Sequence, residues 1–199
     1  MTRRAILAGL AGVAAPGAEP VAVPLRVILD SRARIPPAVL AGFWQSLWPQ
    51  MLGAFAAAGV RIDASEGKGE MKRAPSGRPI FTGLSHNAIN LVLTDAIPME
   101  WDRAHGLAGV TTQYDGDHLC LVAVPRAHGH RIPFVAVNTL VHELLHVLMG
   151  DIFEARPKGL TGRTREARID WYATRLWLFG DGAEIRRGAA AYMARRGAK

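Results

Sequence analysis

The stretch Asn138–Gly150, with the sequence NTLVHELLHVLMG, constrains this chain more than any other part of it. Apart from one glutamate and two histidines the stretch is uncharged, and it contains no proline. These properties predict a helix buried against a sheet and ending near Gly150, because glycine commonly terminates helices. In such a helix His142 and His146 are one turn apart and project from the same face.

The two histidines and the glutamate between them form a metal-binding pattern. Both imidazoles can reach one metal ion, whereas Glu143 is offset by about 100° of helix rotation and can hold a metal-bound water. This spacing is the one that zinc hydrolases use, and the apolar residues around it keep competing polar groups away from the ion. We therefore expect one Zn²⁺ on His142 and His146, with Glu143 as the general base.

A catalytic zinc site needs a third protein ligand and keeps its fourth position for water. A second helix, predicted from about Thr164 to Phe179, carries Glu166 and Asp170 on one face. Glu166 is the expected third ligand, and Asp170 would accept a hydrogen bond from a ligating imidazole. Asp151 and Glu154 are the alternative third ligands.

The motif His142-Glu143-x-x-His146, followed by Glu166-x-x-x-Asp170, resembles the gluzincin branch of the zincin metallopeptidases. The resemblance is confined to these two predicted helices. It implies an α+β, zincin-like fold, in which a small mixed β-sheet packs on the active-site helix and further C-terminal helices follow. It also implies zinc-dependent hydrolysis of peptide bonds in a peptide or protein substrate, which would pair with the strand nearest the active-site helix.

The rest of the chain predicts alternating strands and helices. Apolar residues at period two predict a strand over Val21–Asp30, and helically spaced aromatic residues predict a buried helix from Pro37 to Ala58. Glycine, lysine and serine dominate Ser65–Arg78, which is expected to be a mobile loop. The remaining predictions are strands over Gly59–Ala64 and Ala88–Thr94, a hairpin of Val110–Tyr114 and Leu119–Val124 about Asp115–Asp117, and a last helix over Asp181–Arg196.

Residues 1–18 are typical of a secretory signal rather than of a folded domain. Arg3 and Arg4 precede the short apolar run Ala5–Ala15, and the arginine pair favours the twin-arginine export route. We therefore expect an exported protein, located in the periplasm, with a single zincin-like domain over residues 19–199. The apolar run is too short to span a bilayer, and no later stretch predicts a transmembrane segment.

The charge of the chain bears on its possible partners, and its cysteine content bears on disulfide formation. The formal net charge is +7, and removal of Arg3 and Arg4 with the signal leaves 22 basic against 17 acidic side chains, or +5. Nucleic acid is not an expected partner, because an exported chain without an aromatic-basic motif has no such role. The only cysteine, Cys120, excludes an intramolecular disulfide and is expected to be a buried apolar residue in a strand.

One component of a thermolysin-like gluzincin site has no clear counterpart, namely a histidine or tyrosine from a later subdomain that stabilises the oxyanion. No histidine follows Glu166 in the sequence. The candidates for this role are His128, His130, Tyr114, Tyr172 and Tyr192. Two hypotheses therefore remain: a compact zinc peptidase, or a catalytically weak or inactive zincin-like binding module of the cell envelope. The intact Glu143 favours the peptidase, because a binding module does not need a general base.

Overall fold

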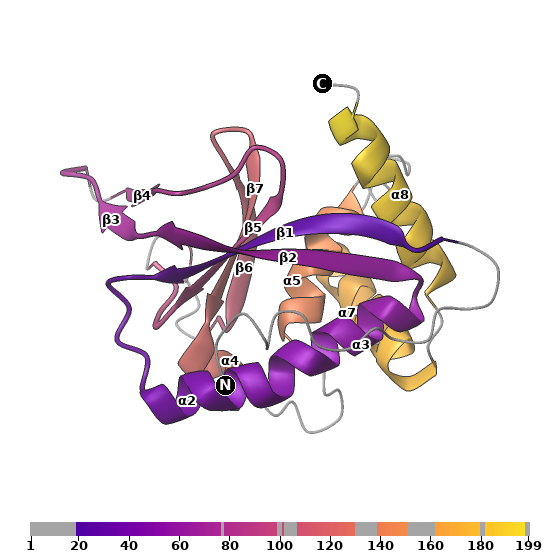
Figure 1. The fold of residues 1–199 in the computed structure, drawn as a ribbon, viewed down its shortest axis with the longest axis horizontal. Helices are drawn as coiled ribbons and strands as arrows, with labels where there is room; N and C mark the ends of the chain where they lie inside the picture. The colour runs from indigo at the N-terminus through magenta and orange to yellow at the C-terminus, as the bar shows by residue number, and fades with distance from the viewer. Residues whose placement is uncertain are drawn as a thin grey trace.

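The computed structural model describes residues 19–76, 78–98, 101, 107–129, 139–150, 162–179 and 182–197. Their architecture is α+β, with a mostly parallel five-stranded sheet, a small two-stranded sheet and several helices (Figure 1). The strands are β1 Val21–Asp30, β2 Val60–Gly69, β3 Met71–Arg73, β4 Pro79–Phe81, β5 Ile89–Thr94, β6 Gly109–Tyr114 and β7 Asp117–Ala123. The helices are α2 Pro37–Gly42, the π-helical segment η1 Phe43–Leu47, α3 Trp48–Ala57, α4 Val124–Gly129, α5 Thr139–Leu148, α7 Gly162–Phe179 and α8 Ala183–Gly197.

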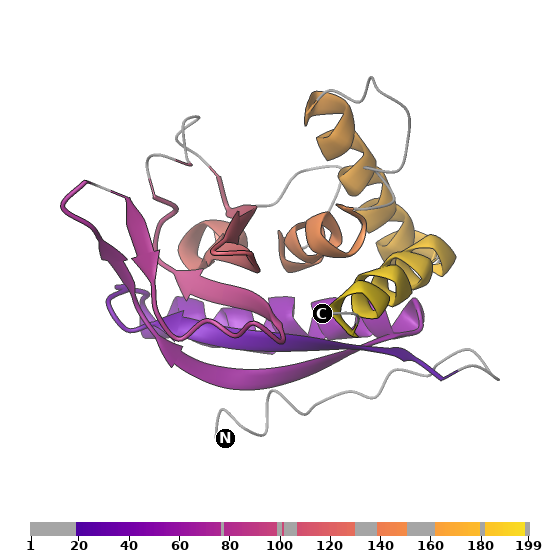
Figure 2. The ribbon, with the colours of Figure 1, turned by 90° about the horizontal axis from the view of Figure 1, so that it is seen from above.

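The main sheet has the strand order β2-β1-β5-β7-β6. All neighbouring strands are parallel except β6, which runs antiparallel to β7 at one edge. Helix α5 contacts β6, and α7 and α8 contact α5, so these three helices lie together (Figure 2). The edge of the sheet and the helix with the metal-binding pattern therefore meet.

The predicted hairpin is confirmed, with a tighter turn than expected. Tyr114 pairs with Asp117, so only Asp115 and Gly116 form the loop, and Asp117 already belongs to β7. Both loop residues have positive φ, 50° and 82°, as a two-residue type I′ turn requires. Val124, expected to end the strand, instead begins the short helix α4, which was not predicted.

The helices cover one face of the main sheet, and this face holds the larger core. Phe43, Trp48 and Phe55 are fully buried there, which confirms that the aromatic stripe of the first helical segment is core. Cys120 is also fully buried in this core. Burial raises the pKa of its thiol to about 12, so the thiol stays protonated and behaves as a small apolar group.

The prediction of a mobile loop over Ser65–Arg78 is wrong. Strand β2 continues through this segment to Gly69 and stays paired with β1 along its whole length, and β3 and β4 form an antiparallel pair after it. The segment is polar and lacks the apolar alternation that indicates a strand. Its glycines are needed where two backbones approach closely. A Cβ atom at Gly69 would collide with the carbonyl oxygen of Thr82. Glycine here is therefore a packing requirement and not a sign of mobility.

Within the part of the chain that the structure describes, no helix is long and apolar enough to cross a membrane. The predicted signal, residues 1–18, lies outside the described residues.

Replacement of Gly69 by alanine should destabilise the protein by about 1–3 kcal/mol, because the added methyl group meets a backbone carbonyl that cannot rotate away. Chemical unfolding of both proteins measures this difference. Gly53→Ala in α3 is the matched control, since a Cβ there meets nothing within 4 Å, and it should stabilise by about 0.5–1 kcal/mol. A Gly69→Ala protein as stable as the parent would show that β2 does not pack as described.

Candidate metal centre

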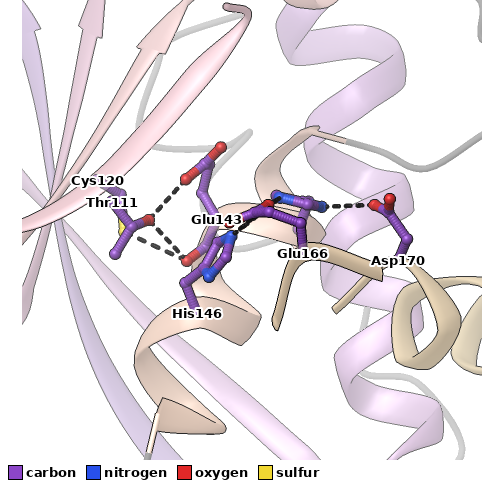
Figure 3. Close-up of polar contacts among 7 residues, drawn as sticks. Thr111, Cys120, Glu143, His146, Glu166 and Asp170 are labelled. Carbon is purple, nitrogen blue, oxygen red and sulfur yellow. Dashed lines mark hydrogen bonds and ion pairs between the residues drawn. The ribbon is translucent and has the colours of Figure 1, made fainter. Parts of the chain in front are cut away.

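Helix α5 carries three kinds of side chain on three different sides. Leu140, Leu144 and Leu148 are buried in the large core, which anchors the helix. His142 and His146 are 18% and 11% exposed and face α7, while the Glu143 side chain is turned toward β6 (Figure 3). The helical rotation of about 100° per residue separates neighbouring side chains in this way. The expected helix end near Gly150 is close to the observed one at Leu148.

The imidazoles of His142 and His146 converge with the carboxylate of Glu166 on α7. Glu166 Oε2 lies 3.2 Å from His142 Nε2 and 3.3 Å from His146 Nε2, and the two Nε2 atoms are 3.0 Å apart. A tetrahedral zinc ion with bonds of about 2.0–2.1 Å holds its ligand atoms about 3.3 Å from one another. The three atoms therefore have the spacing of zinc ligands, and among the described residues they are the group of three that could hold a metal ion.

Asp170 holds one of these imidazoles in place from the opposite side. Its Oδ1 atom lies 3.0 Å from His142 Nδ1, one helical turn after Glu166 on α7 (Figure 3). A hydrogen bond from Nδ1 to Asp170 leaves the Nε2 lone pair of His142 free to bind a metal. Helix α7 is itself fixed because Ile169, Ala173 and Leu176 are buried in the core. The structure thus brings both histidines, Glu166 and Asp170 together.

Glu143 is held against β6 rather than exposed. Its side chain is 5% exposed, and the hydroxyl of Thr111 lies 2.7 Å from Glu143 Oε2 and 3.0 Å from the Glu143 carbonyl oxygen. Two residues earlier on the strand, a Cβ at Gly109 would lie 2.5 Å from Glu143 Oε1. Only glycine leaves room for the carboxylate at that position. Sequence reasoning missed Gly109 and Thr111, and their sole sequence signal is a period-two position on one strand face.

The charges of the centre depend on one another. Hydrogen bonds from His142 and His146 hold the pKa of Glu166 well below its usual range. Burial lowers the pKa of His142, but Glu166, Glu143 and Asp170 together outweigh burial and raise that pKa above its ordinary value. Burial raises the pKa of Glu143, opposed by the nearby His142 and by the hydrogen bond with Thr111. Glu166 is thus the anionic partner of the histidines, while the pKa of the buried Glu143 is raised above its ordinary value.

The structure does not bring Tyr114 or Tyr172 to the metal centre. Tyr114 packs edge-on against Phe81 in the smaller core, on the face of the sheet away from α5. The alternation of side chains along β6 causes this, because Tyr114 and Thr111 point to opposite faces. The Tyr172 hydroxyl donates a hydrogen bond to Glu184 on α8 and is therefore already engaged.

The other predicted candidates lie partly outside the described residues. The His128 side chain and the whole of His130 are not described, and neither are the alternative ligands Asp151 and Glu154. Tyr192 on α8 is buried and, like His146, lines a cavity of about 1200 Å³.

No model of a known protein family matches the chain, and neither a curated protein nor a solved structure shows significant similarity to it. The described residues nevertheless place two imidazoles and one carboxylate within reach of a single metal ion, beside the buried carboxyl group of Glu143.

The purified protein should contain one zinc ion per chain, and Glu166→Ala should lose most of it, because only two ligands then remain. Elemental mass spectrometry after dialysis against zinc-free buffer measures the content. Asp170→Asn should keep zinc at saturation but bind it about 10–100-fold more weakly, since it loses only the support of His142. Full zinc content in Glu166→Ala would assign the third ligand elsewhere, with Asp151 and Glu154 tested next.

In the metal-free protein, Glu166→Gln should reduce stability mainly between about pH 4.5 and 6.5. The folded-state pKa of Glu166 is lowered from 4.5, so its contribution is present above that value and is lost as the pH falls. The folded-state pKa of His142 is raised from 6.5, so its contribution is present below that value and is lost as the pH rises through the raised pKa.

Thermal unfolding of the zinc-free parent and variant across this range tests that window. A difference between the two proteins that is equally large at pH 9 would contradict the pairing of Glu166 with a protonated imidazole. The exposed pair Arg61–Asp63, with a 2.7 Å contact, provides a control, and Asp63→Asn should leave the unfolding temperature nearly unchanged.

Proposed function

We propose that this protein is a zinc-dependent peptidase that hydrolyses peptide bonds. The proposal rests on the convergence of His142, His146 and Glu166, with the buried Glu143 directly after His142 on the same helix. Two neutral imidazoles and one carboxylate are the ligand set of open, catalytic zinc sites. A zinc ion bound there supplies a Lewis acid that activates a water molecule and polarises the carbonyl group of the substrate.

Glu143 acts as the proton carrier of the reaction. Its carboxylate takes a proton from the attacking water and later gives that proton to the leaving amine. Burial raises the pKa of Glu143, which favours a carboxyl group that can both accept and donate a proton. Thr111 suits either state of Glu143. Its hydroxyl can donate to the carboxylate at 2.7 Å, or donate to the Glu143 carbonyl oxygen at 3.0 Å while it accepts from the carboxylic acid.

Strand β6 supports a peptide as the substrate. It is the last strand of the main sheet, and in the described part of the chain its backbone pairs only with β7. Its outer edge can therefore form main-chain hydrogen bonds with an extended peptide, as in strand addition to other sheets. Because Gly109 and Thr111 of this strand contact Glu143, a peptide on the edge passes beside the metal centre.

A zincin-like binding module of the cell envelope is the second candidate function. It is favoured by one observation, namely that neither Tyr114 nor Tyr172 is placed to stabilise an oxyanion. The buried and specifically held Glu143 supports the peptidase instead, because a purely binding site does not need a proton carrier. Export to the periplasm, which residues 1–18 predict, belongs to both candidates.

Glu143→Gln should retain zinc but reduce hydrolysis by about 10²–10⁴-fold, because the amide cannot accept the proton. Zinc content and cleavage of a fluorogenic peptide mixture should be measured on the same preparation. Removal of zinc with a chelator should abolish cleavage by the parent, and added zinc should restore it. Cleavage at the parental rate by Glu143→Gln would exclude Glu143 from the mechanism, while an inactive zinc-loaded parent would favour the binding module.

A further inference from the structure

A cavity of about 1200 Å³ adjoins the metal centre, and the proposed function does not account for it. It lies between the β6–β7 hairpin and helix α8, and the metal-centre residue His146 forms part of its wall. Thr111, which holds Glu143, also lines it. A group bound in this cavity is therefore close to the bond that the metal centre would cleave.

Tyr192 and Arg196 line the cavity, and each has a buried donor atom with no acceptor among the described residues. Tyr192 is 2% exposed, and its buried hydroxyl makes no hydrogen bond. The Nη1 atom of Arg196, one turn later on α8, is likewise buried without a partner. Buried donors are normally satisfied, so two neighbouring exceptions that line one cavity need an explanation.

Among the described acidic residues, the one nearest to these donors, Asp117, does not satisfy them. Asp117 accepts a 2.7 Å contact from His86, and it lies 3.9 Å from Arg196 Nη2, at the limit of an ion pair. The Arg196 guanidinium lies over the Tyr192 ring at 5.4 Å, so the two residues form one unit. Burial raises the pKa of Tyr192 to about 12, and its hydroxyl therefore keeps its proton at neutral pH.

We propose that Tyr192 and Arg196 form a subsite for an acidic side chain of the peptide substrate. The planar guanidinium matches a carboxylate, and the tyrosine hydroxyl supplies a further donor. Strand β6 leads from Gly109 beside Glu143 to Tyr114 at the hairpin, at about 3.4 Å per residue. An extended peptide on this strand reaches the cavity within a few residues of the cleaved bond. The subsite depends on the proposed function in one respect, because the bound carboxylate is assigned to a peptide substrate.

Binding to the zinc-loaded Glu143→Gln protein tests the subsite without catalysis. Two pools of short labelled peptides are compared by fluorescence anisotropy, identical except that aspartate and glutamate in one pool are asparagine and glutamine in the other. The acidic pool should bind about tenfold more tightly, as expected for charge-assisted hydrogen bonds. Addition of Arg196→Gln should remove this preference.

Two further variants test whether the preference arises from the subsite itself, from a loss of stability or from the total positive charge. Tyr192→Phe should reduce the preference without lowering the unfolding temperature, because it deletes a hydroxyl that has no partner among the described residues. Arg187→Gln removes the same charge from an exposed position of α8, 3.3 Å from Glu184, and should keep the preference. Loss of the preference in Arg187→Gln, or its full retention in Arg196→Gln, would overturn the subsite.

The outcomes distinguish the subsite from the peptidase. An acidic preference that depends on Arg196, together with a parent that cleaves no peptide, would keep the subsite and remove the peptidase activity. Cleavage that depends on Glu143, together with equal binding of both pools, would remove only the subsite.

Discussion

The contact between helix α5 and edge strand β6 is the constraint on which the rest of the centre depends. The helix must bury its leucines in the core, present two imidazoles to α7 and place Glu143 on the strand. Gly109 leaves space for the Glu143 carboxylate in this position, and the Thr111 hydroxyl holds it there. The strand therefore holds the Glu143 side chain in place, on the same helix that carries both histidines.

Helix α7 completes the centre from the other side. Its buried residues anchor it in the same core as α5, and its exposed face then delivers Glu166 and Asp170 at the correct turn spacing. The three atoms that could bind the metal are 3.0–3.3 Å apart, a separation compatible with the ligands of one zinc ion. Both helices are anchored in one core, and this packing brings the histidines of α5 and the carboxylates of α7 together.

Local periodicity made part of this arrangement predictable from the sequence. His142 and His146 were found because helical spacing alone places them together, and Glu166 and Asp170 for the same reason. Gly109 and Thr111 were missed because their importance depends on which helix packs against their strand. The β3–β4 pair was missed because its strands are only three residues long and the segment is mostly polar, although Met71 and Phe81 pack in the smaller core. Tyr114 was a reasonable candidate by chemistry, but the pleat of β6 directs it to the opposite face.

X-ray absorption at the zinc edge of the metal-loaded protein tests most directly whether His142, His146 and Glu166 bind the zinc ion. A zinc centre built from α5 and α7 should show a four-coordinate ion with two imidazole nitrogens and oxygen ligands at about 2.0–2.2 Å, and no sulfur ligand. The zinc that the Glu166→Ala variant retains should still have two imidazole ligands, but its oxygen ligands should differ from those of the parent. A sulfur ligand, a single imidazole or a six-coordinate oxygen shell in the parent would contradict a zinc centre built from α5 and α7.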